Sequence, residues 1–200
     1  MSLRGLFYNI IMYPIITKTR KKVNEVIVSL DPQSIIDICC GTGTQLKSLV
    51  KMGYNAIGVD STEEMLEVAR KGKYQPECYQ QDAENLKFPD ESFDVSLLSL
   101  ALHEKELETA KRMVKEARRV LKKGKYLIIV EFCLTKETRL LSKSLIYFIE
   151  KVSGKEHYGN FINYKENQLI EEMICKKDFE IVTKHNLSPS GLEIRVYRKL

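Results

Sequence analysis

A short stretch between residues 34 and 44 combines a carboxylate with closely spaced glycines, a pattern that can do chemistry. It reads Ser-Ile-Ile-Asp-Ile-Cys-Cys-Gly-Thr-Gly-Thr, so an apolar run precedes Gly41 and Gly43. The run predicts a buried parallel strand, and the glycines predict a sharp turn into a helix that starts near Thr44. Such a turn lies at the carboxyl end of a strand, where open α/β sheets bind ligands against a helix N-terminus. We therefore expect a binding site here.

The charge of this stretch indicates which ligand it binds. A dinucleotide fingerprint needs a small residue three positions after the second glycine, but Leu46 stands there. Asp37 lies inside the expected strand, where its negative charge would repel a pyrophosphate and favour a ligand with an ammonium and a sulfonium group. S-adenosylmethionine carries both groups. A nicotinamide-dependent reductase is the alternative, and Leu46 and Asp37 argue against it.

Three motifs in the same order resemble one enzyme family. Residues 37–43 are similar to motif I of the class I S-adenosylmethionine-dependent methyltransferases, with Cys39 where that motif has its first glycine. Residues 82–94, Asp-Ala-Glu-Asn-Leu-Lys-Phe-Pro-Asp-Glu-Ser-Phe-Asp, resemble the acidic loop of the group that acts in ubiquinone and menaquinone biosynthesis. Residues 116–124 resemble the group's Glu-x-x-Arg-Val-Leu-Lys-Pro-Gly, with Lys123 in place of the proline. The resemblance implies a methyltransferase with S-adenosylmethionine as cofactor and S-adenosylhomocysteine as product.

The resemblance also implies which residues hold the cofactor. Asp60 follows the glycines by about 20 residues, where a carboxylate accepts hydrogen bonds from ribose hydroxyls. By position, Asp82 accepts from the adenine amino group and the amide of Ala83 donates to a ring nitrogen. Ser61 and Glu64 form a capping-box pattern that opens the next helix. The full expected cofactor set is Asp37, Cys39, Gly41, Thr42, Gly43, Asp60, Ser61, Met65, Asp82, Ala83 and Ser99.

The acceptor side carries fewer signals. His103 follows an apolar strand expected over residues 95–102, and its ordinary pKa suits a catalytic base near the methyl group. Tyr8 matches an aromatic that folds over the cofactor in similar enzymes, and His157 and Tyr158 lie in a segment that builds the acceptor pocket there. No Asn-Pro-Pro-Tyr tetrad follows the strand, which disfavours nucleobase amines as acceptors. Packing roles for these residues remain the alternative.

The remaining patterns predict a Rossmann-like, doubly wound α/β domain over residues 1–200, with seven strands and an antiparallel last strand. A helical N-terminal lid over residues 1–29 is interrupted at Pro14, and residues 133–165 form an acceptor-side insert with an apolar helix face. A long helix is expected over 104–122 and ends near Gly124, followed by strands at 126–132, 179–185 and 192–197.

Composition limits the classes of function. Five cysteines in no metal-ligand spacing predict reduced thiols, with no disulfide and no metal, and the absence of a signal pattern predicts a cytoplasmic protein. The net charge of +5 is dispersed, so we expect no nucleic-acid partner. We expect methyl transfer to a small, hydrophobic acceptor on carbon, oxygen or nitrogen. There are two alternatives. The first is a phospholipid N-methyltransferase in peripheral membrane contact through the basic run at residues 18–22, and the second is a non-catalytic S-adenosylmethionine-binding protein. The sequence leaves the oligomeric state open.

Overall fold

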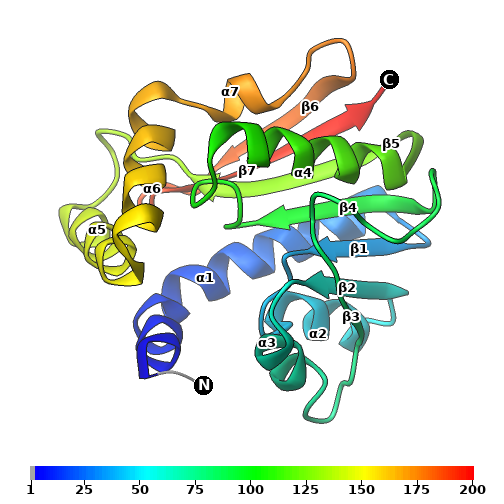
Figure 1. Ribbon diagram of the computed structural model, residues 1–200, viewed down its shortest axis with the longest axis horizontal. Helices are drawn as coiled ribbons and strands as arrows, with labels where there is room; N and C mark the ends of the chain where they lie inside the picture. Colours follow the sequence, from blue (N-terminus) through cyan, green and yellow to red (C-terminus); the bar gives the residue numbers. More distant parts are fainter. Residues whose placement is uncertain (1–2) are drawn as a thin grey trace.

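Seven strands form one mixed sheet in the order β3-β2-β1-β4-β5-β7-β6 (Figure 1). The structure is a computed structural model that describes the backbone of residues 3–200 and the side chains of residues 16–200. The strands are β1 (Ile35–Ile38), β2 (Ala56–Asp60), β3 (Glu77–Gln80), β4 (Phe93–Ser99), β5 (Leu121–Phe132), β6 (Phe179–Asn186) and β7 (Leu192–Lys199). The helices are α1 (Leu3–Leu30), α2 (Thr44–Lys51), α3 (Glu63–Ala69), α4 (Leu107–Val120), α5 (Leu140–Ser153), α6 (Lys155–Asn167) and α7 (Ile170–Met173).

The first five strands in the sheet order run parallel, and β7 lies antiparallel between β5 and β6. β1 sits between β2 and β4, so the strand order reverses beside it. Ligands bind at the carboxyl ends of the strands at such a reversal. The loops that follow β1, β2 and β4 therefore meet at one edge of the sheet, as the sequence predicted for an α/β domain with an antiparallel last strand.

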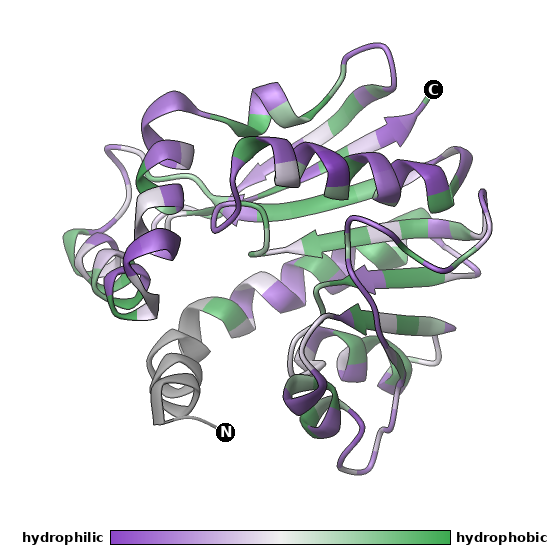
Figure 2. Cartoon of the chain, in the orientation of Figure 1, coloured by the Kyte–Doolittle hydropathy of each residue, from purple (hydrophilic) through white to green (hydrophobic). Residues whose placement is uncertain are grey.

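Each face of the sheet is buried in its own hydrophobic core. One core joins Ile36 and Ile38 to α4, α6 and α7, and the other joins Ile35 to α1, α2 and α3. Successive side chains of a strand point to opposite faces, so one short strand contributes to both cores. Figure 2 shows the result as apolar central strands covered by helices of mixed hydropathy. The central parallel strands β1 and β4 are almost continuously buried because helices cover both of their faces.

Several element boundaries differ from the sequence prediction. α1 continues through Pro14, since a proline can kink a helix without ending it. β4 ends at Ser99, three residues early, because Leu100 takes a left-handed φ of 55°. α4 begins and ends inside the predicted range, and β5 starts directly at Leu121 with Gly124 inside it. The strand extends because Phe93 of β4 pairs with Leu121.

The predicted insert over residues 133–165 forms two helices that pack on each other, α5 and α6, and the short α7 follows before β6. On α5, Ile146 and Ile149 are buried, whereas Leu140 and Leu141 are each 80% exposed. Phe148 is also more than half exposed. The predicted apolar face thus divides between the core and the surface. Within the part of the chain that the structure describes, no helix has the length and apolar character needed to cross a membrane.

Candidate functional site

The loop that joins β1 to α2 curls back on itself through three residues of positive φ. Cys39, Gly41 and Gly43 have φ values of 62°, 54° and 68°. The amide of Cys40 donates to the carbonyl of Val59 over 2.9 Å, which ties the loop to the end of β2. The amide of Gly43 donates to the carbonyl of Cys40 over 2.9 Å, which closes the turn. α2 begins at Thr44, as predicted.

Asp60 at the end of β2 holds this loop in place. One oxygen of its carboxylate accepts the amide of Gly41 over 2.8 Å, and the other accepts the amide of Thr62 over 2.9 Å. The second bond replaces the predicted capping box, so α3 begins at Glu63 with Thr62 as its N-cap and no side-chain cap from Ser61. A carboxylate has about four lone-pair sites, so Asp60 retains acceptor capacity.

The space around the loop fits a bound group on one side only. A Cβ built on Gly41 would meet no atom within 4 Å, whereas a Cβ on Gly43 would lie 2.7 Å from the Cβ of Ala69. The loop therefore packs tightly on α3 and is open beside Gly41 and the Asp60 carboxylate. Ser61 and Met65 are exposed at the start of α3 on the same edge of the sheet.

Asp37 is buried inside β1, with 2% of its surface exposed. Burial raises the pKa of its carboxyl from 3.8 to about 7, and the positive charge of Arg20 opposes this rise. Burial likewise raises the pKa of the Cys39 thiol to about 12, so that thiol stays protonated. β1 thus places a buried carboxyl just before the loop, with the positive charge of Arg20 acting on it, and a further positive charge nearby would favour its ionised form.

The predicted adenine loop is fastened to α4 mainly by Arg119 and Glu116, which form an ion pair on that helix. Arg119 donates to the carbonyls of Leu86 and Phe88 over 2.9 and 2.8 Å, and its partner Glu116 accepts the amide of Leu86 over 2.9 Å. Ahead of this anchor, Asp82 is exposed and accepts the amide of Glu84 over 2.9 Å. Arg119 and Glu116, in the motif at residues 116–124, therefore position the loop at residues 82–94.

The loop after β4 is shaped by Glu131 near the end of β5. One oxygen of its carboxylate accepts the amides of Ala101 and Leu102 over 3.0 and 2.7 Å. The other lies 2.7 Å from Nδ1 of His103, which is only 3% exposed. Ser99 ends β4 just before this turn. A fully buried carboxylate thus fixes both the backbone and the imidazole at this strand end.

His103 and His157 converge on a second buried carboxylate, Glu150. Nε2 of His157 lies 2.6 Å from Oε2 of Glu150, and Nε2 of His103 lies 3.5 Å from the same oxygen. Burial by itself would lower the pKa of His103, but Glu131 and Glu150 raise it to about 10. At neutral pH this imidazole holds its proton, so it can donate a hydrogen bond or carry charge. The catalytic-base role of His103 stays a prediction.

The fold brings most of the predicted site residues to one edge of the sheet. Residues 37–43, Asp60, Asp82, Ser99 and His103 lie at the carboxyl ends of adjacent parallel strands or in the loops that follow them, and His157 joins them from α6. Tyr158 is half-buried, and its ring centroid lies 6.4 Å from that of Phe161. Tyr8 lies outside the described side chains. Sequence reasoning missed Glu131 and Glu150, whose positions inside apolar segments were the available signal.

Comparisons with known proteins agree with this geometry. Residues 36–129 match the family described as a methyltransferase domain. A demethylmenaquinone methyltransferase of Thermotoga maritima is 29% identical over 88% of this chain and 82% of its own length. An uncharacterised methyltransferase of Synechocystis is 31% identical over 81% of this chain and 74% of its own. Other demethylmenaquinone methyltransferases match over shorter parts, from 39% to 56% of their length.

Among solved structures, magnesium protoporphyrin IX methyltransferase from Synechocystis, with bound S-adenosylhomocysteine, superposes with a TM-score of 0.67. The match covers 92% of this chain and 83% of that one at 20% identity, which speaks for the fold. The chain belongs to the class I S-adenosylmethionine-dependent methyltransferases. It is an enzyme of that class, and S-adenosylmethionine is its cofactor.

Proposed function

We propose that this enzyme transfers the methyl group to a small hydrophobic acceptor held between the loop after β4 and the α5–α6 insert. The docking of α6 on that loop carries the proposal. Nδ2 of Asn160 donates to the carbonyl of Glu104 over 2.9 Å, and the rings of His103 and His157 lie 5.8 Å apart. The insert therefore adds aromatic side chains where β4 ends, next to the predicted methyl position. One relative is named a demethylmenaquinone methyltransferase, and this name supports an acceptor of the same class.

The proposed roles of the cofactor residues follow from their charges and positions. The free lone pairs of Asp60 suit ribose hydroxyls, Asp82 and the amide of Ala83 suit adenine, and Asp37 suits the ammonium end. When bound, S-adenosylmethionine supplies a methyl group already activated on a sulfonium. The chain then has to align the acceptor with that methyl and exclude water, an effect worth roughly 7–11 kcal/mol in well-oriented reactions.

A series of acceptors tests the proposal. We would measure S-adenosylhomocysteine release with phenolic or quinol acceptors that differ only in alkyl chain length. Each buried methylene is worth about 0.8 kcal/mol, so we expect kcat/KM to rise roughly fourfold per methylene until the pocket is filled. Tyr158→Ala should raise KM for the longer members, whereas Tyr74→Ala, in the loop before β3, should change nothing. A kcat/KM that does not change with alkyl chain length, or no turnover with any acceptor despite cofactor binding, would contradict the proposal.

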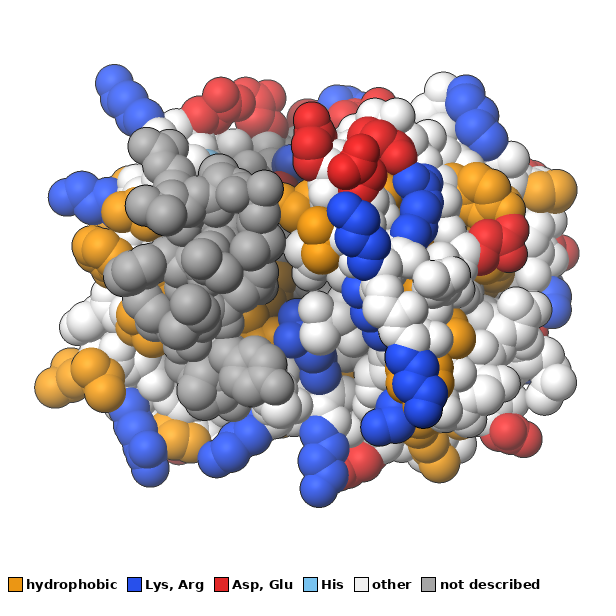
Figure 3. All heavy atoms as spheres, turned by 90° about the horizontal axis from the view of Figure 1, so that it is seen from below, with side chains coloured by type: hydrophobic (Ala, Val, Ile, Leu, Met, Phe, Trp, Pro, Cys, Tyr) orange, Lys and Arg blue, Asp and Glu red, His pale blue; other side chains and the backbone are white. Residues whose placement is uncertain are grey.

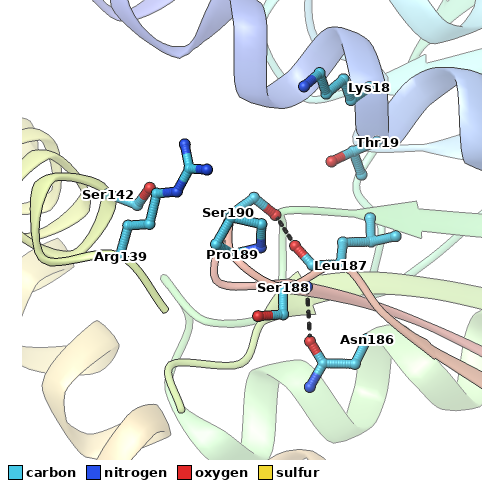
Figure 4. A pocket seen from close by; sticks show the side chains of 9 residues that line it. All are labelled: Lys18, Thr19, Arg139, Ser142, Asn186, Leu187, Ser188, Pro189 and Ser190. Atoms are coloured by element: carbon cyan, nitrogen blue, oxygen red, sulfur yellow. Dashed lines mark hydrogen bonds between the residues drawn. The ribbon is translucent and has the colours of Figure 1, made fainter. Parts of the chain in front are cut away.

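A second candidate acceptor is a phospholipid at a membrane surface. Leu140 and Leu141 are exposed at the start of α5, directly after Arg139. Arg139, Lys18 and Ser190 line a pocket of about 450 Å³ between α5, α1 and the β6–β7 turn (Figure 4). Figure 3 shows Lys and Arg side chains spread over one face of the molecule, with hydrophobic side chains scattered on both sides of it. A basic pocket beside exposed apolar side chains suits an anionic headgroup and its acyl chains.

Sedimentation with lipid vesicles separates this candidate from the first. Binding to anionic vesicles, weakening with added salt and reduced by Arg139→Gln or Leu141→Ser, would support it. Met52→Ser removes an exposed apolar side chain directly after α2 and serves as the matched control. Vesicle binding that does not depend on lipid charge and salt, or an equal loss of binding in the Met52→Ser variant, would contradict this candidate.

A further inference from the structure

Two imidazoles and one carboxylate converge at the contact of α5, α6 and the loop after β4. Among the side chains of residues 16–200, His103, Glu150 and His157 form a group whose possible ligand atoms all lie within 4.8 Å of one another. Both Nε2 atoms face the same oxygen of Glu150, at 3.5 and 2.6 Å. Glu150 and His103 are buried, and His157 is one quarter exposed, which leaves a route for an ion.

The outward nitrogens of both imidazoles face further carboxylates. Nδ1 of His103 lies 2.7 Å from Glu131, and Nδ1 of His157 lies 3.3 Å from Glu104. In protein metal sites, a ligating histidine usually directs its other ring nitrogen at a carboxylate, which fixes the ring and makes the ligand more basic. This cluster has that arrangement on both histidines.

We propose that His103, His157 and Glu150 bind a divalent first-row transition ion, with Zn²⁺ as the best match. Nitrogen and oxygen ligands suit zinc, and three protein ligands leave a position for water or an acceptor heteroatom. The Nε2 protons would leave as the ion binds, and Glu150 would change from hydrogen-bond acceptor to ligand. His103 and His157 also border the acceptor region proposed above, but the metal-binding test below needs no acceptor.

The geometry needs one small adjustment. Ligands at the usual 2.0–2.1 Å from zinc lie about 3.3 Å apart in a tetrahedral site. The 3.5 Å between His103 and Glu150 already fits, whereas the 2.6 Å between His157 and Glu150 is a hydrogen bond that must lengthen. His157 is the partly exposed member of the group, so its side chain has room to move. Phe132 and Phe161 pack around His103 and give the site a dry wall.

The cluster of His103, Glu150 and His157 also lies close to the loop between β1 and α2. The charges of Glu104 and Lys105 both act on the pKa of the Cys39 thiol, which places the loop after β4 beside motif I. A bound ion would therefore lie near the loop between β1 and α2, in the region where methyl transfer is proposed.

Cobalt binding to the chelator-treated full-length protein tests the site directly. We expect visible d–d absorption that saturates at one equivalent of Co²⁺ and is displaced by Zn²⁺. Nitrogen and oxygen ligation lacks the strong charge-transfer band that cysteine thiolates would give, so the spectrum also distinguishes binding at thiols. His157→Ala and Glu150→Gln should abolish the signal. Glu104→Gln should weaken affinity by about 10–100-fold, as expected for loss of an outer carboxylate.

The third histidine of the chain, His185 on β6, supplies the matched control, since His185→Ala should leave cobalt binding unchanged. Circular dichroism and binding of S-adenosylhomocysteine establish that each variant is folded. If Glu150→Gln fails to fold, His157→Ala decides the test because its side chain is partly exposed. No saturable spectrum in the native protein, or a spectrum that persists in His157→Ala, would overturn the proposal.

Discussion

Asp37 is a buried carboxyl whose ionisation makes folding less favourable. Its pKa is raised by burial from 3.8 to about 7, so the folded state holds a proton that the unfolded chain has lost between these values. Unfolding then releases a proton, and the free energy of unfolding falls as pH rises from about 4 to about 7. Above pH 7 the folded protein bears the cost of an ionised buried group. A cationic ligand would offset that cost.

Asp37→Asn should therefore separate stability from binding. Without ligand at pH 8, we expect the variant to have a higher Tm than the native protein, and the difference should shrink at pH 5. Affinity for S-adenosylhomocysteine should fall by roughly 30-fold, as for loss of about 2 kcal/mol from one partner of a desolvated charge pair. Thermal unfolding and calorimetric titration measure the two quantities. A lower Tm at pH 8 together with unchanged affinity would contradict both expectations.

Cys39 occupies a backbone conformation that favours glycine. At a φ of 62°, a side chain costs about 1–2 kcal/mol, which the family's first glycine avoids. Glycine also gives the unfolded chain more conformational freedom, which lowers the stability gained from relieving the backbone strain by about 0.4–1 kcal/mol. We expect Cys39→Gly to be more stable than Cys39→Ala by about 1 kcal/mol, the reverse of the usual order. Urea denaturation of the two variants measures this, and a more stable alanine variant would refute it.

At the level of elements, α4 acts as the anchor of the predicted adenine loop. Arg119 reaches two backbone carbonyls and Glu116 at once, and Glu116 returns a hydrogen bond to the loop amide of Leu86. A planar guanidinium can make these bonds together, whereas the point charge of lysine cannot. The loop's position is therefore set by a side chain more than 30 residues further along the chain.

Arg119→Lys should loosen this anchor without unfolding the sheet. We expect a loss of about 1–3 kcal/mol in stability and weaker binding of S-adenosylhomocysteine, because the loop with Asp82 becomes less ordered. Arg112→Lys is the control, since Arg112 also pairs with the loop, through Glu84, but is exposed and bonds no loop carbonyl. Equal effects of the two substitutions on binding would argue against the anchor.

The sequence was most informative where structure is local. The glycine turn, the start of α2 and the strand before Asp60 follow from short-range patterns, and the structure confirms them. The start of β5 was misplaced because strand pairing between Phe93 and Leu121 overrides the local helix pattern. Glu150 was missed because its partners lie on other elements and only the fold brings them together.

At the scale of the whole molecule, the two cores share the strands β1, β4, β5 and β7. We propose that residues of both halves therefore unfold together as one domain. Loss of packing on one face removes support from the strands that form the other. Ligand binding at the carboxyl edge should then stabilise the entire chain.

S-adenosylhomocysteine at a hundredfold excess over its Kd should raise Tm by roughly 5–11 °C in one transition, from about 2.7 kcal/mol of binding energy. NAD at the same concentration should cause no shift. Asp60→Ala should remove the shift, and Glu67→Ala, an exposed carboxylate on α3, should retain it. Two separate unfolding transitions would contradict the proposal that the chain unfolds as one domain. A Tm shift with NAD would contradict the assignment of S-adenosylmethionine as the cofactor.

The tight contact between Gly43 and Ala69 has an evolutionary consequence. Because a Cβ at position 43 would lie 2.7 Å from that of Ala69, these two positions share a single small volume. Position 43 cannot gain a side chain unless position 69 loses its single side-chain carbon, and its φ of 68° disfavours a side chain in addition. Descendants of this sequence should therefore show coupled substitution at 43 and 69, with glycine at 69 appearing before any larger residue at 43. A drift experiment under selection for cofactor binding would record that order.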